Sequence, residues 1–90
     1  MVILDQHISN KALDRLELNG YDVWKVTDTA IDHEWFKEGL KRGVKIVVSR
    51  DKEIERYCYI TDVTLVSPPE NLAGSEQARY IHNKIKELTK

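Results

Sequence analysis

Three observations predict an α/β fold with a small parallel sheet of about four strands and helices on both faces. Short apolar runs alternate along the chain with longer segments of helical periodicity, and such alternation is typical of parallel sheets with right-handed crossovers. The runs at 2–4 and 44–49 are almost wholly apolar, as in strands buried on both faces. Each is followed by an aspartate, Asp5 or Asp51, where a parallel strand leaves the carboxyl edge of its sheet.

Length and composition indicate one small globular domain over residues 1–90. The hydrophobic share is 41%, which is ordinary for a folded chain and excludes a disordered one. Fourteen basic and 15 acidic residues give a net charge of −1, so no overall basic field indicates nucleic-acid binding. The composition is still compatible with a local basic patch on the surface.

Cysteine usage and hydropathy predict a soluble cytoplasmic protein. Cys58 is the one cysteine, so an internal disulfide and a cysteine-rich zinc site are excluded, and a reducing compartment is favoured. No apolar run approaches the roughly 18–20 residues of a membrane span. The first strand follows Met1 directly, so we expect no signal peptide and no membrane partner.

The first strand and helix are predicted from residues 2–20. The strand covers residues 2–5, and Ser9 or Asn10 caps the helix because a short polar side chain accepts a bond from a free amide. Asn19-Gly20 ends the helix, since both residues tolerate the left-handed conformation. One helical face is apolar and carries Ile8, Ala12, Leu13 and Leu16.

Residues 22–43 predict a second strand and a second helix. The strand at 22–26 alternates in polarity and is expected nearer an edge than the first. Thr27-Asp28-Thr29 is a loop rich in capping residues, and Gly43 stops the following helix. The apolar face of that helix is predicted to carry Ile31, Trp35, Phe36, Gly39 and Leu40.

The second half predicts two further strand–helix units. The third strand covers 44–49, and Asp51 begins a short helix that carries Ile54, Tyr57 and Cys58. The fourth strand is 64–66, which Pro68-Pro69 prevents from continuing. The last helix starts near Ser75, and its apolar positions are Ala78, Ile81, Ile85 and Leu88.

Strand order decides whether the two aspartates meet. In doubly wound sheets the first strand is usually central, with the second on one side and the third on the other. Asp5 and Asp51 would then leave neighbouring strands, which lie about 4.8 Å apart. Two carboxylates at that spacing could share one small cation.

The acidic residues Asp5, Asp51, Asp32 and Glu34 form the chemical hypothesis. Mg²⁺ and Mn²⁺ prefer oxygen ligands and activate water against phosphodiesters. The alternative is structural, because Asp51 and Asp32 can each cap the helix that follows them. Asp5 is harder to explain as a cap, since it directly follows a buried strand.

Cationic and aromatic residues extend this hypothesis. Arg50 and Lys52 flank Asp51 and either hold phosphates of a bound strand or form a solvated surface pair. His7 is either an acid–base group or substrate contact beside Asp5, or a polar turn residue. Trp24 is the candidate for base stacking, whereas Trp35 and Phe36 are assigned to the core. The motifs G-x-x-x-x-G-K-S/T, G-x-G-x-x-G and G-x-S-x-G are absent, and Cys58 is interpreted as a packed thiol.

Four short motifs resemble those of the small PIN-like nuclease family, which is related to the VapC toxins. Leu4-Asp5-Gln6-His7 is similar to the family's L-D-E-N opening, and Asn19-Gly20-Tyr21-Asp22-Val23 to its G-H/Y-D-V sequence. Asp32-His33-Glu34-Trp35-Phe36 is similar to its D-x-E-I/L segment, and Ser49-Arg50-Asp51-Lys52-Glu53 to its T-R-D-K-D signature. Order and approximate spacing agree over residues 2–70.

The resemblance implies a PIN-like three-layer sandwich and a metal-dependent ribonuclease. Asp5, Asp32 and Asp51 would be the catalytic Mg²⁺ or Mn²⁺ ligands with Glu34 as a helper, and RNA would be the substrate. Such nucleases are often the toxin half of a toxin–antitoxin pair, which makes an antitoxin protein a further expected partner.

The chain departs from the family pattern near the site. Gln6 stands where the family commonly has Glu, His7 replaces Asn, and Glu53-Ile54 replaces Asp and Phe. The neutral amide of Gln6 removes a charge from the site. The alternative is therefore a degenerate PIN-like domain that binds nucleic acid or protein without cleaving. Exposed strand edges of so small a sheet also make a homodimer plausible.

Overall fold

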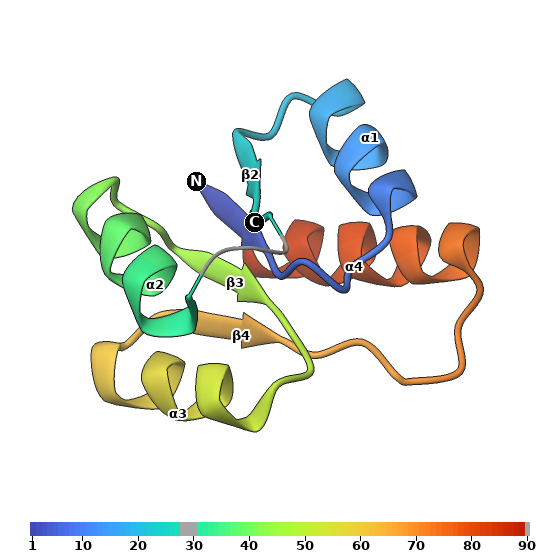
Figure 1. Cartoon of the computed structure of the whole chain (residues 1–90). Coiled ribbons are helices and arrows are strands. Elements are labelled where there is room, and N and C mark those ends of the chain that lie inside the picture. Colours follow the sequence, from blue (N-terminus) through green and yellow to red (C-terminus); the bar gives the residue numbers. More distant parts are fainter. Residues whose placement is uncertain (28–30, 90) are drawn as a thin grey trace.

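The fold was examined in a computed structural model that describes residues 1–27 and 31–89. Strands and helices alternate along the chain (Figure 1). The strands are β1 (Val2–Leu4), β2 (Val23–Lys25), β3 (Ile46–Val48) and β4 (Thr64–Val66). The helices are α1 (Asn10–Leu18), α2 (Asp32–Lys41), α3 (Lys52–Thr61) and α4 (Gly74–Leu88). The predicted loop at Thr27-Asp28-Thr29 lies largely outside the described residues.

The four strands form one parallel sheet in the order β2-β1-β3-β4. The predicted α/β class and the central place of β1 between β2 and β3 are therefore confirmed. β1, β2 and β3 are shorter than predicted, since each has three residues, and β4 has the predicted bounds. β2 is an edge strand, as its alternating polarity indicates.

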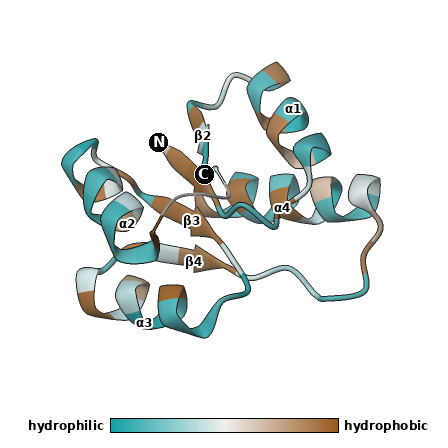
Figure 2. Ribbon diagram, in the orientation of Figure 1, coloured by the Kyte–Doolittle hydropathy of each residue, from teal (hydrophilic) through white to brown (hydrophobic). Residues whose placement is uncertain are grey.

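Helices cover both faces of the sheet and complete three layers. Alternate residues of β1 and β3 point to opposite faces, so each strand contributes to two separate cores. The core beneath α1 and α4 contains Val2, Leu4, Ile8, Ala12, Leu16, Ile46, Val48, Val66, Ala78, Ile81 and Ile85. The core beneath α2 and α3 contains Ile3, Val26, Trp35, Phe36, Val44, Val47, Ile54, Cys58 and Val63. Figure 2 shows β1 and β3 as hydrophobic and the helices as mixed in hydropathy.

Helix ends follow the predicted chemistry at several points. The Ser9 hydroxyl accepts a hydrogen bond from the Lys11 amide (3.1 Å) and caps α1. Gly20 and Gly43 have φ of +85° and +82° just after α1 and α2, a conformation in which other residues are strained. None of the described helices has the length and apolar character needed to cross a bilayer.

Three residues predicted for buried helical stripes are exposed. Ile31, Leu40 and Leu88 have 54%, 40% and 49% of their surface accessible. Ile31 precedes the first turn of α2, and Leu40 and Leu88 occupy the last turns of α2 and α4. A helical stripe is buried only over the length that the three-residue strands cover, so its end positions extend beyond the sheet.

Gly39 brings α2 unusually close to β1. A Cβ atom at Gly39 would overlap Ile3 Cδ1, and Gly39 is buried. The helix can therefore approach the central strand more closely than a helix with any side chain at this position.

A side-chain hydrogen bond joins α1 to α4 beside their apolar contacts. Arg15 Nε donates to His82 Nδ1 at 2.9 Å, and the Tyr21 ring lies edge-on to the imidazole at 5.9 Å. His82 is buried, and burial together with the positive charges of Arg15 and Lys86 lowers its pKa below 6.5. A proton on Nδ1 would remove the acceptor for Arg15 and place two cations in contact.

We predict that this contact makes the fold sensitive to acid. An unfolded histidine takes up its proton near pH 6.5, whereas folded His82 does so only at lower pH. The unfolded state therefore binds more protons in this interval, and the free energy of unfolding falls as the pH drops below about 6.5. Urea denaturation at pH 7.5 and 5.5 measures the loss, which should be smaller in His82→Gln. Exposed His33 supplies the control, because His33→Gln should keep the full pH dependence. An equal loss in both variants would contradict the role of His82.

Candidate functional site

The carboxyl ends of β1 and β3 meet at the point where the chain changes direction across the sheet. From β1 the chain continues to β2 on one side, and from β3 it continues to β4 on the other. Open α/β sheets bind ligands in the crevice outside such a switch point. Asp5 follows the last residue of β1, and Ser49 follows the last residue of β3.

A buried hydroxyl joins the two predicted aspartates. Ser49 Oγ donates to Asp5 Oδ2 at 2.7 Å and accepts a hydrogen bond from the Asp51 backbone amide at 3.0 Å. Asp5 is 7% exposed and Ser49 is 0% exposed. Ser49 thus joins Asp5 to the Asp51 backbone, and the sharing of one cation by the two carboxylates stays a prediction.

The Asp5 carboxylate has a second hydrogen bond. Its Oδ1 accepts from the backbone amide of His7 at 3.1 Å, which turns the chain out of β1. A buried carboxylate needs such partners, because an unpaired one would pay the full cost of desolvation. The two bonds use two of the roughly four acceptor positions of the carboxylate.

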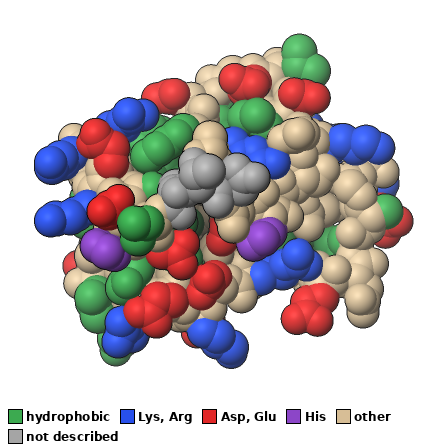
Figure 3. All heavy atoms as spheres, in the orientation of Figure 1, with side chains coloured by type: hydrophobic (Ala, Val, Ile, Leu, Met, Phe, Trp, Pro, Cys, Tyr) green, Lys and Arg blue, Asp and Glu red, His purple; other side chains and the backbone are tan. Residues whose placement is uncertain are grey.

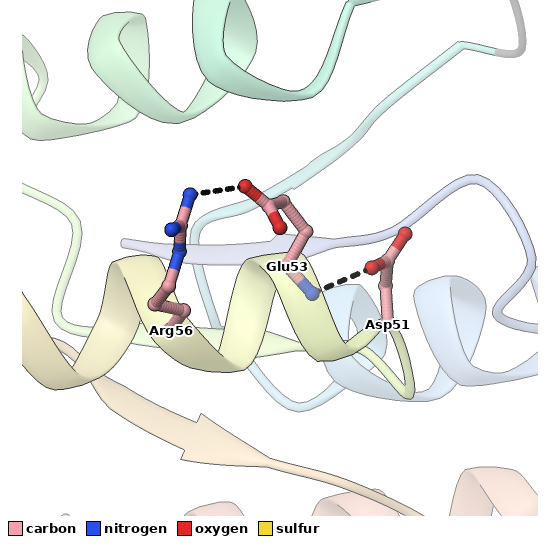
Figure 4. A network of polar contacts seen from close by, with 3 residues as sticks. All are labelled: Asp51, Glu53 and Arg56. Atoms are coloured by element: carbon pink, nitrogen blue, oxygen red, sulfur yellow. Dashed lines mark hydrogen bonds and ion pairs between the residues drawn. The ribbon is translucent and has the colours of Figure 1, made fainter.

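Asp51 caps α3, as one of the two sequence interpretations predicted. Its Oδ1 accepts from the Glu53 amide at 2.8 Å, and Figure 4 shows the other oxygen directed away from the helix. The Glu53 carboxylate pairs in turn with Arg56, one turn further along the helix. Asp51 is exposed, so its second oxygen can serve a ligand while the first holds the helix end.

Asp32 and Glu34 lie on the first turn of α2. The interpretation of Asp32 as a helix cap is wrong, since Ile31 is the N-cap residue and its side chain makes no capping hydrogen bond. Asp32 instead accepts a hydrogen bond from Trp35 Nε1 at 3.2 Å, and Glu34 is exposed. Among residues 1–27 and 31–89, no three His, Cys, Asp or Glu side chains are grouped as a metal ion would require.

The predicted cationic residues differ in how they are held. Arg50 is exposed, and its Nη1 donates to the Glu70 carbonyl at 3.1 Å, which ties the loop after β4 to the end of β3. Lys52 begins α3 and His7 follows β1, and both are exposed. Figure 3 shows acidic and basic side chains interspersed on one face of the molecule, without a field of one sign.

The aromatic predictions are confirmed for the core and corrected for Trp24. Trp35 and Phe36 are buried beneath α2. Trp24 is only partly exposed, and the Arg42 guanidinium lies 4.4 Å from the centre of its ring. A cation over its face leaves this indole less suited to stacking on a base than the sequence suggested.

Cys58 is a packed thiol, as predicted. Burial, with a smaller contribution from the negative charge of Glu55, raises its pKa from 9.0 to about 11. The reactive thiolate is therefore scarce at neutral pH.

Sequence reasoning missed Ser49 and Lys25 as site residues. The available signal for Ser49 was a small hydroxyl placed directly after a buried strand and two residues before Asp51. Lys25 ends β2 on the other side of β1, and its Nζ donates to Asn10 Oδ1 at 2.6 Å. It adds a cation to this edge of the sheet.

No protein-family model, curated protein or solved structure matches the chain. The resemblance to PIN-like nucleases consequently stays a prediction that depends on the four motifs. The structure itself shows an α/β sandwich in which the Ser49 hydroxyl joins the Asp5 carboxylate to the Asp51 backbone amide at the switch point.

We predict that Ser49→Ala lowers the free energy of unfolding by about 1–3 kcal/mol, because it leaves a buried carboxylate oxygen and the Asp51 amide without their partner. Urea denaturation measures the change. Ser67→Ala is the matched control, since Ser67 follows β4 as Ser49 follows β3 but is exposed. A loss below about 0.5 kcal/mol, the ordinary effect of a surface change, would show that the Ser49 link is not needed.

Proposed function

We propose that the chain is a metal-dependent ribonuclease whose active site lies at the carboxyl ends of β1 and β3. The observation that carries the proposal is the Ser49 hydroxyl, which joins the Asp5 carboxylate to the Asp51 backbone amide and so ties two acidic residues to the switch point of the sheet. Two carboxylates beside exposed cations suit a phosphodiester that arrives with a divalent cation.

The donor set is suited to Mg²⁺ or Mn²⁺. Asp5 keeps acceptor positions beyond its two hydrogen bonds, and Asp51 has a second oxygen that its cap does not use. Mg²⁺ commonly binds one or two protein carboxylates together with water and substrate phosphate. Asp5 and Asp51 would hold the ion. Asp32 and Glu34 are also predicted as ligands, but a site with two carboxylates does not require them.

The chain's own residues would position the RNA and manage protons. When bound, the metal supplies an activated water and neutralises phosphate charge. Arg50 and Lys52 flank Asp51 and would contact phosphates on either side of the scissile bond. His7 follows Asp5 by two residues and would give a proton to the leaving oxygen. The motif resemblance extends the proposal to the toxin half of a toxin–antitoxin pair, with an antitoxin protein as partner.

A second function is favoured by a specific feature of Asp5. Its two hydrogen bonds, to Ser49 and to the His7 amide, also suit a purely structural carboxylate. Gln6, beside it, is neutral where the resembled family commonly has an acid. The second candidate is a PIN-like module that binds nucleic acid or protein and does not cleave.

The test is cleavage of single-stranded RNA in millimolar Mn²⁺ or Mg²⁺. We expect Asp5→Asn and Asp51→Asn each to reduce the rate about a hundredfold or more, because each removes a metal ligand. Asparagine is a good helix cap, so Asp51→Asn should keep α3 intact, which circular dichroism checks. Asp14→Asn is the control, since it removes the same charge from the exposed side of α1.

Metal binding separates the two candidates. The nuclease should be stabilised by Mn²⁺ in a thermal melt, and the shift should vanish in Asp51→Asn. Cleavage that continues in excess EDTA would contradict the metal mechanism. Absence of both cleavage and a thermal shift would favour the binding module.

A further inference from the structure

β4 has an open edge with unpaired backbone groups. The Thr64 amide donates to the Lys45 carbonyl at 3.0 Å, and the Val66 carbonyl accepts from the Ser49 amide at 3.1 Å. Because backbone groups of alternate residues point to opposite sides of a strand, the N–H and C=O of Leu65 face away from β3. Within the described part of the chain, neither group has a backbone partner.

The two edges of the sheet differ in how they are protected. Natural edge strands are blunted by charged side chains, especially lysine, or by proline. The β2 edge has Asp22 and Lys25 at its ends, and Arg42 covers Trp24 between them. The β4 edge has no charged residue and no proline from Val63 to Ser67. It is the edge open to pairing.

α3 lies alongside β4 (Figure 1). One flank of α3 faces α2, and its residues Tyr57, Ile60 and Thr61 line a groove between the two helices. At 100° per residue the opposite flank carries residues that are all exposed, and they are Lys52, Glu55, Tyr59 and, just past the helix, Asp62. Tyr59 is 86% exposed, and tyrosine is a residue type enriched at protein–protein interfaces.

This flank is complementary to itself under a two-fold axis. In an isologous pair a residue i meets j, and j meets i. An antiparallel arrangement of two α3 helices centred on Tyr57 places Lys52 opposite Asp62 of the other copy. The same centre places Glu55 opposite the Tyr59 hydroxyl. In each pair the two groups attract each other, Lys52 with Asp62 and Glu55 with the Tyr59 hydroxyl. Both pairs are symmetric about Tyr57, as a single two-fold axis requires.

We infer that the partner of the β4 edge is a second copy of this chain. The two β4 strands pair antiparallel around Leu65, which gives its outward N–H and C=O groups partners and joins two sheets into one. The two α3 helices then meet along the flank that carries Lys52, Glu55, Tyr59 and Asp62. Backbone bonds supply affinity, and the charged pairs fix the register. The inference does not depend on nuclease activity.

The test is the mass in solution, measured by sedimentation equilibrium on the full chain. We expect twice the 10.5 kDa of the monomer at concentrations of about 10–100 µM, as for a modest interface. Leu65→Pro should yield a monomer, because it removes the outward N–H without removing a bond to β3. Lys52→Glu and Asp62→Lys should each raise the dissociation constant at least about tenfold, and the double variant should recover dimerisation.

A matched control lies at the other edge. Asp22→Lys makes the same charge change just before β2 as Asp62→Lys makes just before β4, and it should leave the mass unchanged. If circular dichroism shows that Leu65→Pro is unfolded, the test depends on Lys52→Glu, Asp62→Lys and their double variant. A wild-type monomer at several hundred µM would overturn the inference. So would a dimer that Asp22→Lys disrupts, or one that neither Lys52→Glu nor Asp62→Lys weakens.

Discussion

The hydrogen bond between Asp5 and Ser49 constrains the rest of this small fold. It places a carboxylate in the interior, where an unpaired charge would be costly, and it joins the ends of the two central strands. Ser49 also orients the Asp51 amide, so the start of α3 is fixed from the same atom. On the β1 side, the second oxygen of Asp5 turns the chain toward α1. Two helices therefore begin from one buried polar contact.

This hydrogen bond is important because the strands of the sheet are very short. Strands of three residues supply few ladder bonds, and most stabilisation must come from the two cores on either face. The α1–α4 layer adds a polar tie of its own, in which the Ser9 amide donates to Gln77 and Arg15 donates to His82. Both hydrogen bonds lie beside the apolar contacts between α1 and α4. They favour one arrangement of the two helices and replace little of the apolar area that is buried there.

The architecture could be predicted because it is encoded locally. Alternating strands and helices, with β1 and β3 almost wholly apolar, indicate a parallel sheet, and the doubly wound rule gives the place of β1. Local periodicity cannot tell how far a helix extends past the sheet. Ile31 and Leu40 were consequently assigned to the core although both are exposed.

The candidate site was predicted less completely, because its contacts are non-local. Ser49 finds its partner 44 residues earlier in the chain, and nothing in its neighbourhood shows that it will be buried against Asp5. Asp51 could be foreseen both as a cap and as a site residue, and its two oxygens allow both. Asp32 does not cap α2, and its Oδ1 accepts a hydrogen bond from Trp35, one turn away on the same helix.

The distance between α2 and the sheet depends on the contact between Gly39 and Ile3. Because a methyl group at position 39 would occupy the space of Ile3 Cδ1, the height of α2 above the sheet is set jointly by these two side chains. A larger residue at position 39 requires that Ile3 Cδ1 move, that a smaller residue replace Ile3, or that the helix rise from the sheet. Since Asp32 and Glu34 begin the same helix, the separation between the acidic turn of α2 and the Asp5 edge depends in part on an apolar contact.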